Sequence, residues 1–187
     1  KLGFSALEPV FRSLTNSACQ LDTLRLADNE MDFEGGMSLC AALKHNHTIT
    51  DLDISKNLLT SNVAIELGDL SKQFTVNGKI ITPLKIRTLK INDNPDIGPK
   101  GTRHLIVSLS NEWTTHLELR NCNASESFAH EFSKSLKDIT VAWRYVDISQ
   151  NRIKKVGLNQ IFWSLRVNRK IRVLKLGSNQ GGLNLAT

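Results

Sequence analysis

The chain has 187 residues, of which 40% are hydrophobic and 22% charged, and its formal net charge is +6. This length and apolar content are sufficient for one domain with a buried core. No stretch reaches the roughly 18 consecutive apolar residues that a membrane-spanning helix requires, so the sequence contains no candidate transmembrane segment.

The first fifteen residues predict a helix with one apolar side. Most of their apolar residues are three or four positions apart, which is the helical period. No strand-like pattern precedes them, so we expect this helix to be the end of a repeat whose strand is absent. The apolar residues are Leu2, Phe4, Leu7, Phe11 and Leu14.

Residues 21–29 read Leu-x-x-Leu-x-Leu-x-x-Asn, and the same pattern recurs five more times along the chain. Successive closing positions are 28, 37, 28, 29 and 28 residues apart, by subtraction of their numbers. A fixed period with one interruption is typical of a solenoid of stacked repeats. The closing residues are Asn29, Asn57, Asn94, Cys122, Asn151 and Asn179.

Each of the first five motifs is followed by apolar residues at helical spacing, so each repeat is predicted to be a short strand and then a helix. Strands that are joined through helices lie parallel, with right-handed crossovers. Because strands pack about 4.8 Å apart and helices roughly 8 to 10 Å apart, the stack must curve with the sheet inside. The closing Asn can satisfy backbone groups of the following turn. Candidate helix starts are Asp32, Thr60, Gly98 and Ser125, and candidate ends are Asn46, Asn111 and Asn168.

The motif resembles the leucine-rich repeat, and its length of 28 to 29 residues resembles the ribonuclease-inhibitor type of that family. The family also accepts a Cys at the closing position, as at Cys122. The resemblance implies an α/β leucine-rich-repeat solenoid, with a curved parallel sheet on the concave side and helices on the convex side. Family members include ribonuclease inhibitor, immune sensors, cytoskeletal and ciliary regulators, and activators of the Ran GTPase. We expect residues 1–187 to form a single array of about six repeats and, because neither end has a polar capping repeat, to be an excerpt of a longer array.

The one longer interval places about nine extra residues near 74–83. Asn77-Gly78 between apolar runs predicts a hairpin. A tolerated surface loop is one interpretation of the insertion. The other is a projection that contacts a partner, because a solvated loop rarely keeps several apolar side chains. Those side chains are Phe74, Val76, Ile80 and Ile81.

Alternation along each strand turns the residues between the apolar positions toward the concave side. These residues form columns of mixed charge with one Tyr and one His, a composition closer to a protein-binding surface than to a catalytic cleft. A solvated sheet face whose charges partly pair is the alternative. The predicted partner-binding residues are Arg25, Asp51, Asp53, Lys90, His116, Glu118, Arg120, Tyr145, Asp147 and Lys175.

The sequence predicts no catalytic, cofactor or metal site. Lys90 lies between Asp53 and Glu118 in one column, which disfavours a cluster of carboxylates around a metal. His116 has acidic and phenolic neighbours, but a sheet face offers no pocket that excludes water. Residues 98–102 lack the Gly-Lys-Ser/Thr order of a phosphate-binding loop. We therefore expect a protein that is not an enzyme and has no small-molecule substrate.

The net positive charge comes from the C-terminal repeats. Residues 148–187 contain eight basic residues and no acidic one. Arg152, Lys154 and Lys155, the basic rim, fall near the start of the last predicted helix, where the helix dipole disfavours positive charge. A locally unfavourable choice often marks a functional position, so we expect the rim to meet an acidic partner surface. An unselected basic surface is the alternative.

Cys19, Cys40 and Cys122 form no Cys-x-x-Cys motif and cannot all pair with one another. This favours a reducing, intracellular setting, cytoplasmic or cytoskeletal.

The leading hypothesis is a protein–protein interaction scaffold in a cytoskeletal, ciliary or signalling assembly. One alternative is a regulator of an enzyme such as a small GTPase. Another is a binder of nucleic acid or of an anionic membrane through the basic C-terminal repeats, although basic groups on opposite rims disfavour a single nucleic-acid groove.

Overall fold

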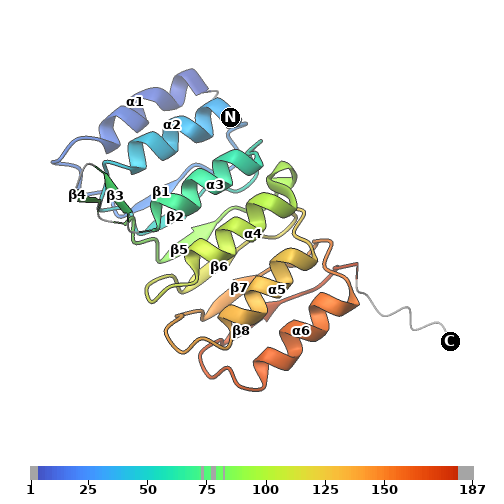
Figure 1. Ribbon diagram of the computed structural model, residues 1–187. Helices are drawn as coiled ribbons and strands as arrows, with labels where there is room; N and C mark the ends of the chain where they lie inside the picture. Colours follow the sequence, from blue (N-terminus) through green and yellow to red (C-terminus); the bar gives the residue numbers. More distant parts are fainter. Residues whose placement is uncertain (1–3, 73, 77–78, 82, 181–187) are drawn as a thin grey trace.

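The fold is an array of strand–helix units arranged in two layers (Figure 1). One layer is a six-stranded parallel sheet, and the other consists of α-helices that run alongside it. The predicted fold class, an α/β solenoid with a parallel sheet on one side and helices on the other, is therefore confirmed. The computed structural model describes residues 4–72, 74–76, 79–81 and 83–180, with the backbone alone at 4–5, 74–76 and 79–81.

The sheet has the strand order β1-β2-β5-β6-β7-β8, so each strand pairs with the strand of the next repeat. Equivalent residues lie side by side: Leu24 pairs with Leu52, and Leu52 pairs with Leu89. All six strands fall on the predicted motifs. They are β1 (Thr23–Arg25), β2 (Asp51–Asp53), β5 (Thr88–Lys90), β6 (His116–Glu118), β7 (Tyr145–Asp147) and β8 (Val173–Lys175).

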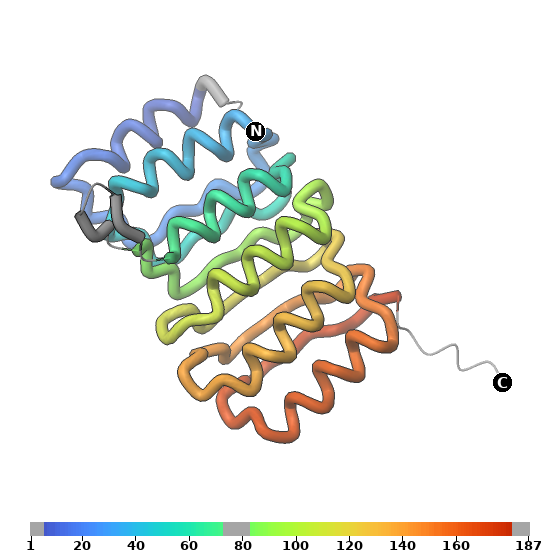
Figure 2. Tube along the Cα trace, in the orientation of Figure 1, coloured from blue at the N-terminus to red at the C-terminus, as the bar shows by residue number. Residues whose placement is uncertain are grey.

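Each helix packs against the helix of the next repeat, and the backbone in Figure 2 winds through the units in chain order. Asp32 caps the second helix, where its carboxylate accepts a hydrogen bond from Gly35 N at 3.1 Å. Thr60 and Ser125 also occupy the residue before a helix, but their side chains make no capping bond. The helices are α1 (Phe4–Leu14), α2 (Phe33–Leu43), α3 (Ser61–Leu70), α4 (Gly98–Leu109), α5 (Glu126–Ser135) and α6 (Lys155–Leu165), with a 3-10 turn, η1 (Pro95–Ile97), before α4.

The helices α2 to α5 bury their residues in one repeating order: two adjacent positions, a gap of two, two more, a gap of one, and two more. In α4 these are 101–102, 105–106 and 108–109. The second member of a pair faces the following helix, as shown by Gly36, whose added Cβ would lie 2.7 Å from Val63. In α6 only the first members, Gly157, Ile161 and Ser164, are buried.

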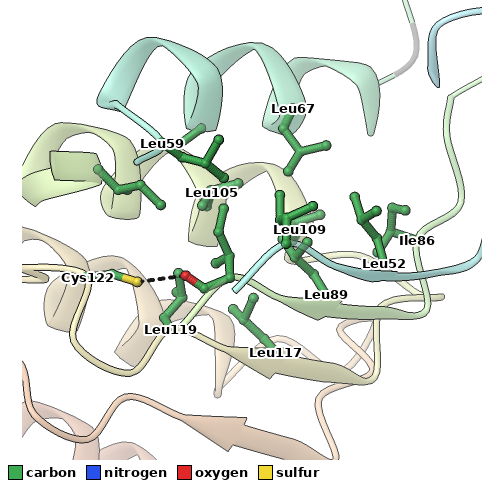
Figure 3. Packing of buried hydrophobic residues seen from close by; sticks show 14 of the residues in the cluster. Leu52, Leu59, Leu67, Ile86, Leu89, Leu105, Leu109, Leu117, Leu119 and Cys122 are labelled. Atoms are coloured by element: carbon green, nitrogen blue, oxygen red, sulfur yellow. Dashed lines mark hydrogen bonds between the residues drawn. The ribbon is translucent and has the colours of Figure 1, made fainter. Parts of the chain in front are cut away.

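The core lies between the sheet and the helices. Trp143 is buried, and its Nε1 donates to Ser135 Oγ at 3.1 Å. Cys122 lies in the same interior, and its Sγ donates to the Ile91 carbonyl at 3.1 Å (Figure 3). Figure 3 also shows leucines of successive strands beneath leucines of the helices, namely Leu52, Leu89, Leu117, Leu67, Leu105 and Leu109.

The closing Asn residues form a ladder, but the backbone N–H groups that they accept from belong to the turn of the preceding repeat and not, as predicted, to the turn that follows them. The Asn57 Oδ1 accepts hydrogen bonds from Asn29 N and Met31 N, at 3.1 and 2.9 Å. Its Nδ2 donates to the carbonyls of Leu26 and Ile54, both at 3.0 Å. One buried side chain thus satisfies backbone groups in two repeats. Equivalent bonds are made by Asn94, Asn151 and Asn179.

A second series of Asn residues holds the opposite turns, where helices end. The Asn46 Oδ1 accepts from Thr48 N and Ile49 N, and its Nδ2 donates back to the Leu14 carbonyl of the preceding repeat. Asn168 makes the same three kinds of bond. The helices α2 and α6 end at Leu43 and Leu165, three residues before the predicted positions. Asn46 and Asn168 instead hold the turns that follow and link neighbouring repeats.

The insertion contains two short strands, β3 (Phe74–Val76) and β4 (Lys79–Ile81), which pair antiparallel with Phe74 opposite Ile81. Asn77 and Gly78 lie outside the described residues, and so do the side chains that the sequence offers for contact with a partner. That contact stays a prediction.

Candidate protein-binding face

The in-register sheet brings the concave residues into rows. Arg25 pairs with Asp53 and Asp53 with Lys90, while His116 pairs with Tyr145 across the next strands. The ten residues predicted for partner binding are therefore spread over all six strands or follow them directly. Nine of them fall into two groups that share Lys90, one over β5 to β8 and one over β1 to β5, and Arg120 lies outside both.

The first group centres on Glu118, which we call the Glu118 cluster together with Lys90, His116, Tyr145 and Lys175. The Glu118 Oε1 lies 2.8 Å from His116 Nε2 and 3.1 Å from Lys90 Nζ. The imidazole stacks on the Tyr145 ring with centroids 4.1 Å apart and planes within 6° of parallel. Lys175 Nζ also lies over the Tyr145 ring, 5.2 Å from its centroid. Four neighbouring strands, β5 to β8, thus contribute to one connected set of side chains.

The carboxylate of Glu118 is held in its charged form. Burial raises the pKa of Glu118, but hydrogen bonds from His116, Asn92 and Lys90 outweigh this effect and bring the pKa below its usual value. Asn92 donates to Glu118 Oε2 at 2.7 Å. Sequence reasoning missed Asn92 as part of the site. Asn92 lies two residues after β5, and only the fold shows how close it lies to Glu118.

Asp147 and Lys175 extend this cluster toward β8. Asp147 is only 6% exposed, and its Oδ1 accepts from Ser149 Oγ at 2.6 Å. Lys175 Nζ lies 3.8 Å from Asp147 Oδ2. The neighbouring Tyr145 side chain, and then the carboxylates of Asp147 and Glu118, raise the pKa of Lys175. Asp147 therefore lies on the predicted face but acts mainly by holding its neighbours.

The second group lines a hollow of about 320 Å³ over β1, β2 and β5. Arg25 and Lys90 stand on either side of Asp51 and Asp53 there. The Asp51 Oδ2 accepts from Arg87 Nη2 at 2.7 Å. Burial raises the pKa of Asp51, but hydrogen bonds from Thr88, Thr50 and Arg87 lower it further than burial raises it. The hollow is open and polar, with charges of both signs at its wall.

Arg120 lies at the carboxyl ends of the strands, where its Nη2 pairs with Asp93 Oδ2 at 2.5 Å. The basic rim lies apart from the concave residues. Lys154 is the residue before α6, Lys155 begins the helix, and both are exposed. Lys154 N donates to Glu126 Oε1 at 2.6 Å. The structure therefore separates the concave face from the rim.

Within the described parts of the chain, no group of three or more His, Cys, Asp and Glu residues is placed to hold a metal ion. Burial raises the pKa of the Cys40 and Cys122 thiols to about 12, which removes their nucleophilic character at neutral pH. None of the helices in the described ranges is long and apolar enough to cross a membrane.

No protein-family model matches the sequence. Among solved structures, the chain is similar to Leiomodin-1 Actin-Binding Site 2 (ABS2), with a TM-score of 0.60 and 15% sequence identity. The match covers 86% of this chain and 90% of that chain. A likeness at this level of identity establishes the shared fold, which is the α/β solenoid described above.

Proposed function

We propose that the chain is a protein-binding scaffold and that its concave sheet face is the binding surface. The observation that carries this proposal is the Glu118 cluster. Stacking and ion pairs hold its aromatic and charged groups in place, while Lys90 and Lys175 remain about half open to solvent. Side chains that are ordered before binding lose less entropy when a partner arrives. Tyr and basic residues are also frequent among those that contribute most to interfaces.

Actin is the first partner to test, and a cytoskeletal assembly is the setting we propose. This choice rests on the printed name of the similar structure, Leiomodin-1 Actin-Binding Site 2. We also assign the repeats to the ribonuclease-inhibitor type. Their closing residues are mostly 28 or 29 positions apart, and an α-helix follows each of the first five strands of the six-stranded sheet. An intracellular location agrees with the free thiols of Cys19, Cys40 and Cys122.

We further propose that the chain acts without catalysis. The carboxylates of Asp51 and Glu118 are each engaged by basic or amide donors that keep them charged. A general acid or base needs a pKa near the working pH, and these groups are moved away from it.

The test compares two double variants with the same change in net charge. Lys90→Ala/Lys175→Ala removes two concave positive charges, and Lys100→Ala/Lys137→Ala removes two exposed charges at α4 and after α5. Binding to monomeric and filamentous actin is measured for both and for the parent chain. We expect the concave variant to bind about tenfold more weakly, and the control to bind as the parent does.

Equal affinity of both variants would reject the concave face. No binding of the parent chain to either form of actin would reject actin but leave a protein partner open. Acceleration of GTP hydrolysis by a small GTPase on addition of the chain would favour the alternative of an enzyme regulator.

A further inference from the structure

The side of α6 that faces away from the sheet carries large apolar residues in contact with solvent. Val156, Trp163 and Val167 are 66%, 65% and 62% exposed. Val156 and Trp163 are seven positions apart on α6, which places them within about 20° of one another around the helix, and Val167 lies in the turn two residues after the helix ends. α6 is the last helix in the described part of the chain, and it lies in the helix layer, away from the concave face (Figure 1). We call these three residues the α6 stripe.

The other repeats show that the fold does not require this stripe. The shared order of buried residues lets α6 be matched to α2, α3, α4 and α5 position by position. Among the residues that match Val156 and Trp163, only Val107 is large and apolar. The apolar character of the stripe is therefore a property of this repeat and has no packing role in common with the rest. The matching residues are Glu34, Asn62, Lys100 and Ser127 for Val156, and Ala41, Asp69, Val107 and Lys134 for Trp163.

Basic residues flank the stripe at both ends. Lys154 and Lys155 lie at the start of α6, and Arg166 and Arg169 lie after its end. All four are exposed, and residues 148–187 contain no acidic side chain. The Arg166 guanidinium lies 4.8 Å from the Trp163 ring centroid, which holds the indole at the surface. The basic residues at the two ends of α6 thus border a single apolar surface about 16 Å long.

The shape of this surface distinguishes between two anionic partners. An acidic peptide would need a groove, and the hollow of about 470 Å³ between α5 and α6, which Val156 and Lys154 help to line, also has the Glu126 carboxylate in its wall. That charge repels an acidic ligand. Trp163 does not line this hollow and is 65% exposed, and an exposed Trp on an open surface fits a partner that can close around it. Trp at the surface with Lys and Arg around it is the composition of segments that lie in the interface of a bilayer.

We propose that the outer side of α6 binds the surface of an anionic membrane. Val156 and Trp163 enter the headgroup region, while Lys154, Lys155, Arg166 and Arg169 pair with lipid phosphates and carboxylates. Both contributions are needed, since a few apolar side chains or a few basic residues alone bind a membrane only weakly. This surface lies on the layer opposite the concave face, so a protein partner and a membrane can be held at the same time.

The test uses the full chain with vesicles of phosphatidylcholine alone and of phosphatidylcholine with about 30% phosphatidylserine. Co-sedimentation should show at least about tenfold stronger binding to the anionic vesicles at low salt, and this preference should fall as salt is raised. The emission of the exposed Trp163 should shift to shorter wavelength on binding, and this shift should be absent in Trp163→Ser, which keeps the buried Trp143 and the half-buried Trp113.

Two variants locate the contact. Trp163→Ser should weaken binding to anionic vesicles about tenfold or more, and Val156→Ser should also weaken it. The matched control is Val107→Ser, which removes an exposed apolar side chain from the equivalent position of α4 and should bind as the parent does. Circular dichroism establishes that each variant is folded, which is expected because these side chains lie outside the core.

Three results would overturn the proposal. They are equal binding to both kinds of vesicle, equal binding of the Trp163→Ser and Val107→Ser variants, and no binding of the parent chain to anionic vesicles. If an acidic amphipathic peptide shielded Trp163 and the chain bound no vesicles, the surface would be a protein-binding site. That result would also overturn the membrane proposal.

Discussion

Asn57→Ala removes the side chain that ties the first two complete repeats together. Two backbone N–H groups, of Asn29 and Met31, lose their acceptor, and three carbonyls lose a donor. Asn57 is 4% exposed, so water replaces these bonds poorly. An unsatisfied buried group costs about 1 to 3 kcal/mol. Counting only the two N–H groups, and some relaxation of the turn, we expect a loss of about 2 to 4 kcal/mol in the free energy of unfolding.

The assay is urea unfolding of the full chain followed by circular dichroism, with the midpoint and slope analysed together. Asn159→Ala serves as the control, because Asn159 is exposed on α6 and the same atoms are removed. Cys122→Asn tests the ladder in the opposite direction. It places an Asn at the one position that lacks it and should change stability less than Asn57→Ala does. A loss below about 0.5 kcal/mol for Asn57→Ala, within the range of ordinary surface substitutions, would show that the ladder does not bear on stability.

Gly157→Ala should destabilise by about 1 to 3 kcal/mol, because the added Cβ would lie 2.7 Å from Ala129 Cβ, whereas Gly177→Ala, with open space around it, should be neutral by the same unfolding assay. Lys155→Glu should raise the melting temperature slightly, since a negative charge at a helix start gains about 0.3 to 1 kcal/mol. The folded-state pKa of Glu118 is lowered, so its contribution is complete above the unfolded pKa of about 4.5 and is lost as the pH falls through the folded value. Stability should therefore fall below about pH 4.5, and less steeply in Glu118→Gln.

The sequence predicts the repeats well because every stacked unit must satisfy the same packing constraints. Leu24, Leu52 and Leu89 are apolar because each faces the same interior, and the period alone places the strands in register. A helix boundary depends on a few local bonds instead. Asp32 caps α2 as expected, but Thr60 and Ser125 only occupy the capping position. Side-chain rotation, which the sequence does not determine, decides between these outcomes.

The predicted exposure of single residues was less accurate at the first strand. Leu21 takes the first apolar position of its motif, yet 43% of it is exposed. The equivalent Ile49 and Ile86 are each 1% exposed, because repeats cover them on both sides. One position of the pattern therefore has different burial in different repeats, and a repeat motif read alone cannot show this.

The backbone turns before the ladder were missed entirely. In every complete repeat the residue before the closing position has positive φ, including Lys56 at 54° and Gln150 at 54°. Neither residue favours that conformation, whereas Asp28, Asp93 and Asn121 at the same position do, so composition gives a signal in only half of the repeats. The bonds of Asn57 and Asn151 to the adjoining backbone impose it. The network around Glu118 was likewise hidden, because Asn92 and Glu118 are 26 residues apart in the chain.

Hydrogen–deuterium exchange of the full chain, alone and with saturating actin, tests the concave binding face most directly. The account predicts slower exchange in the strands and the turns after them, above all in β5 to β8 around Glu118 and Tyr145, with little change in α2 to α5. Slower exchange confined to those helices, with the strands unchanged, would contradict it.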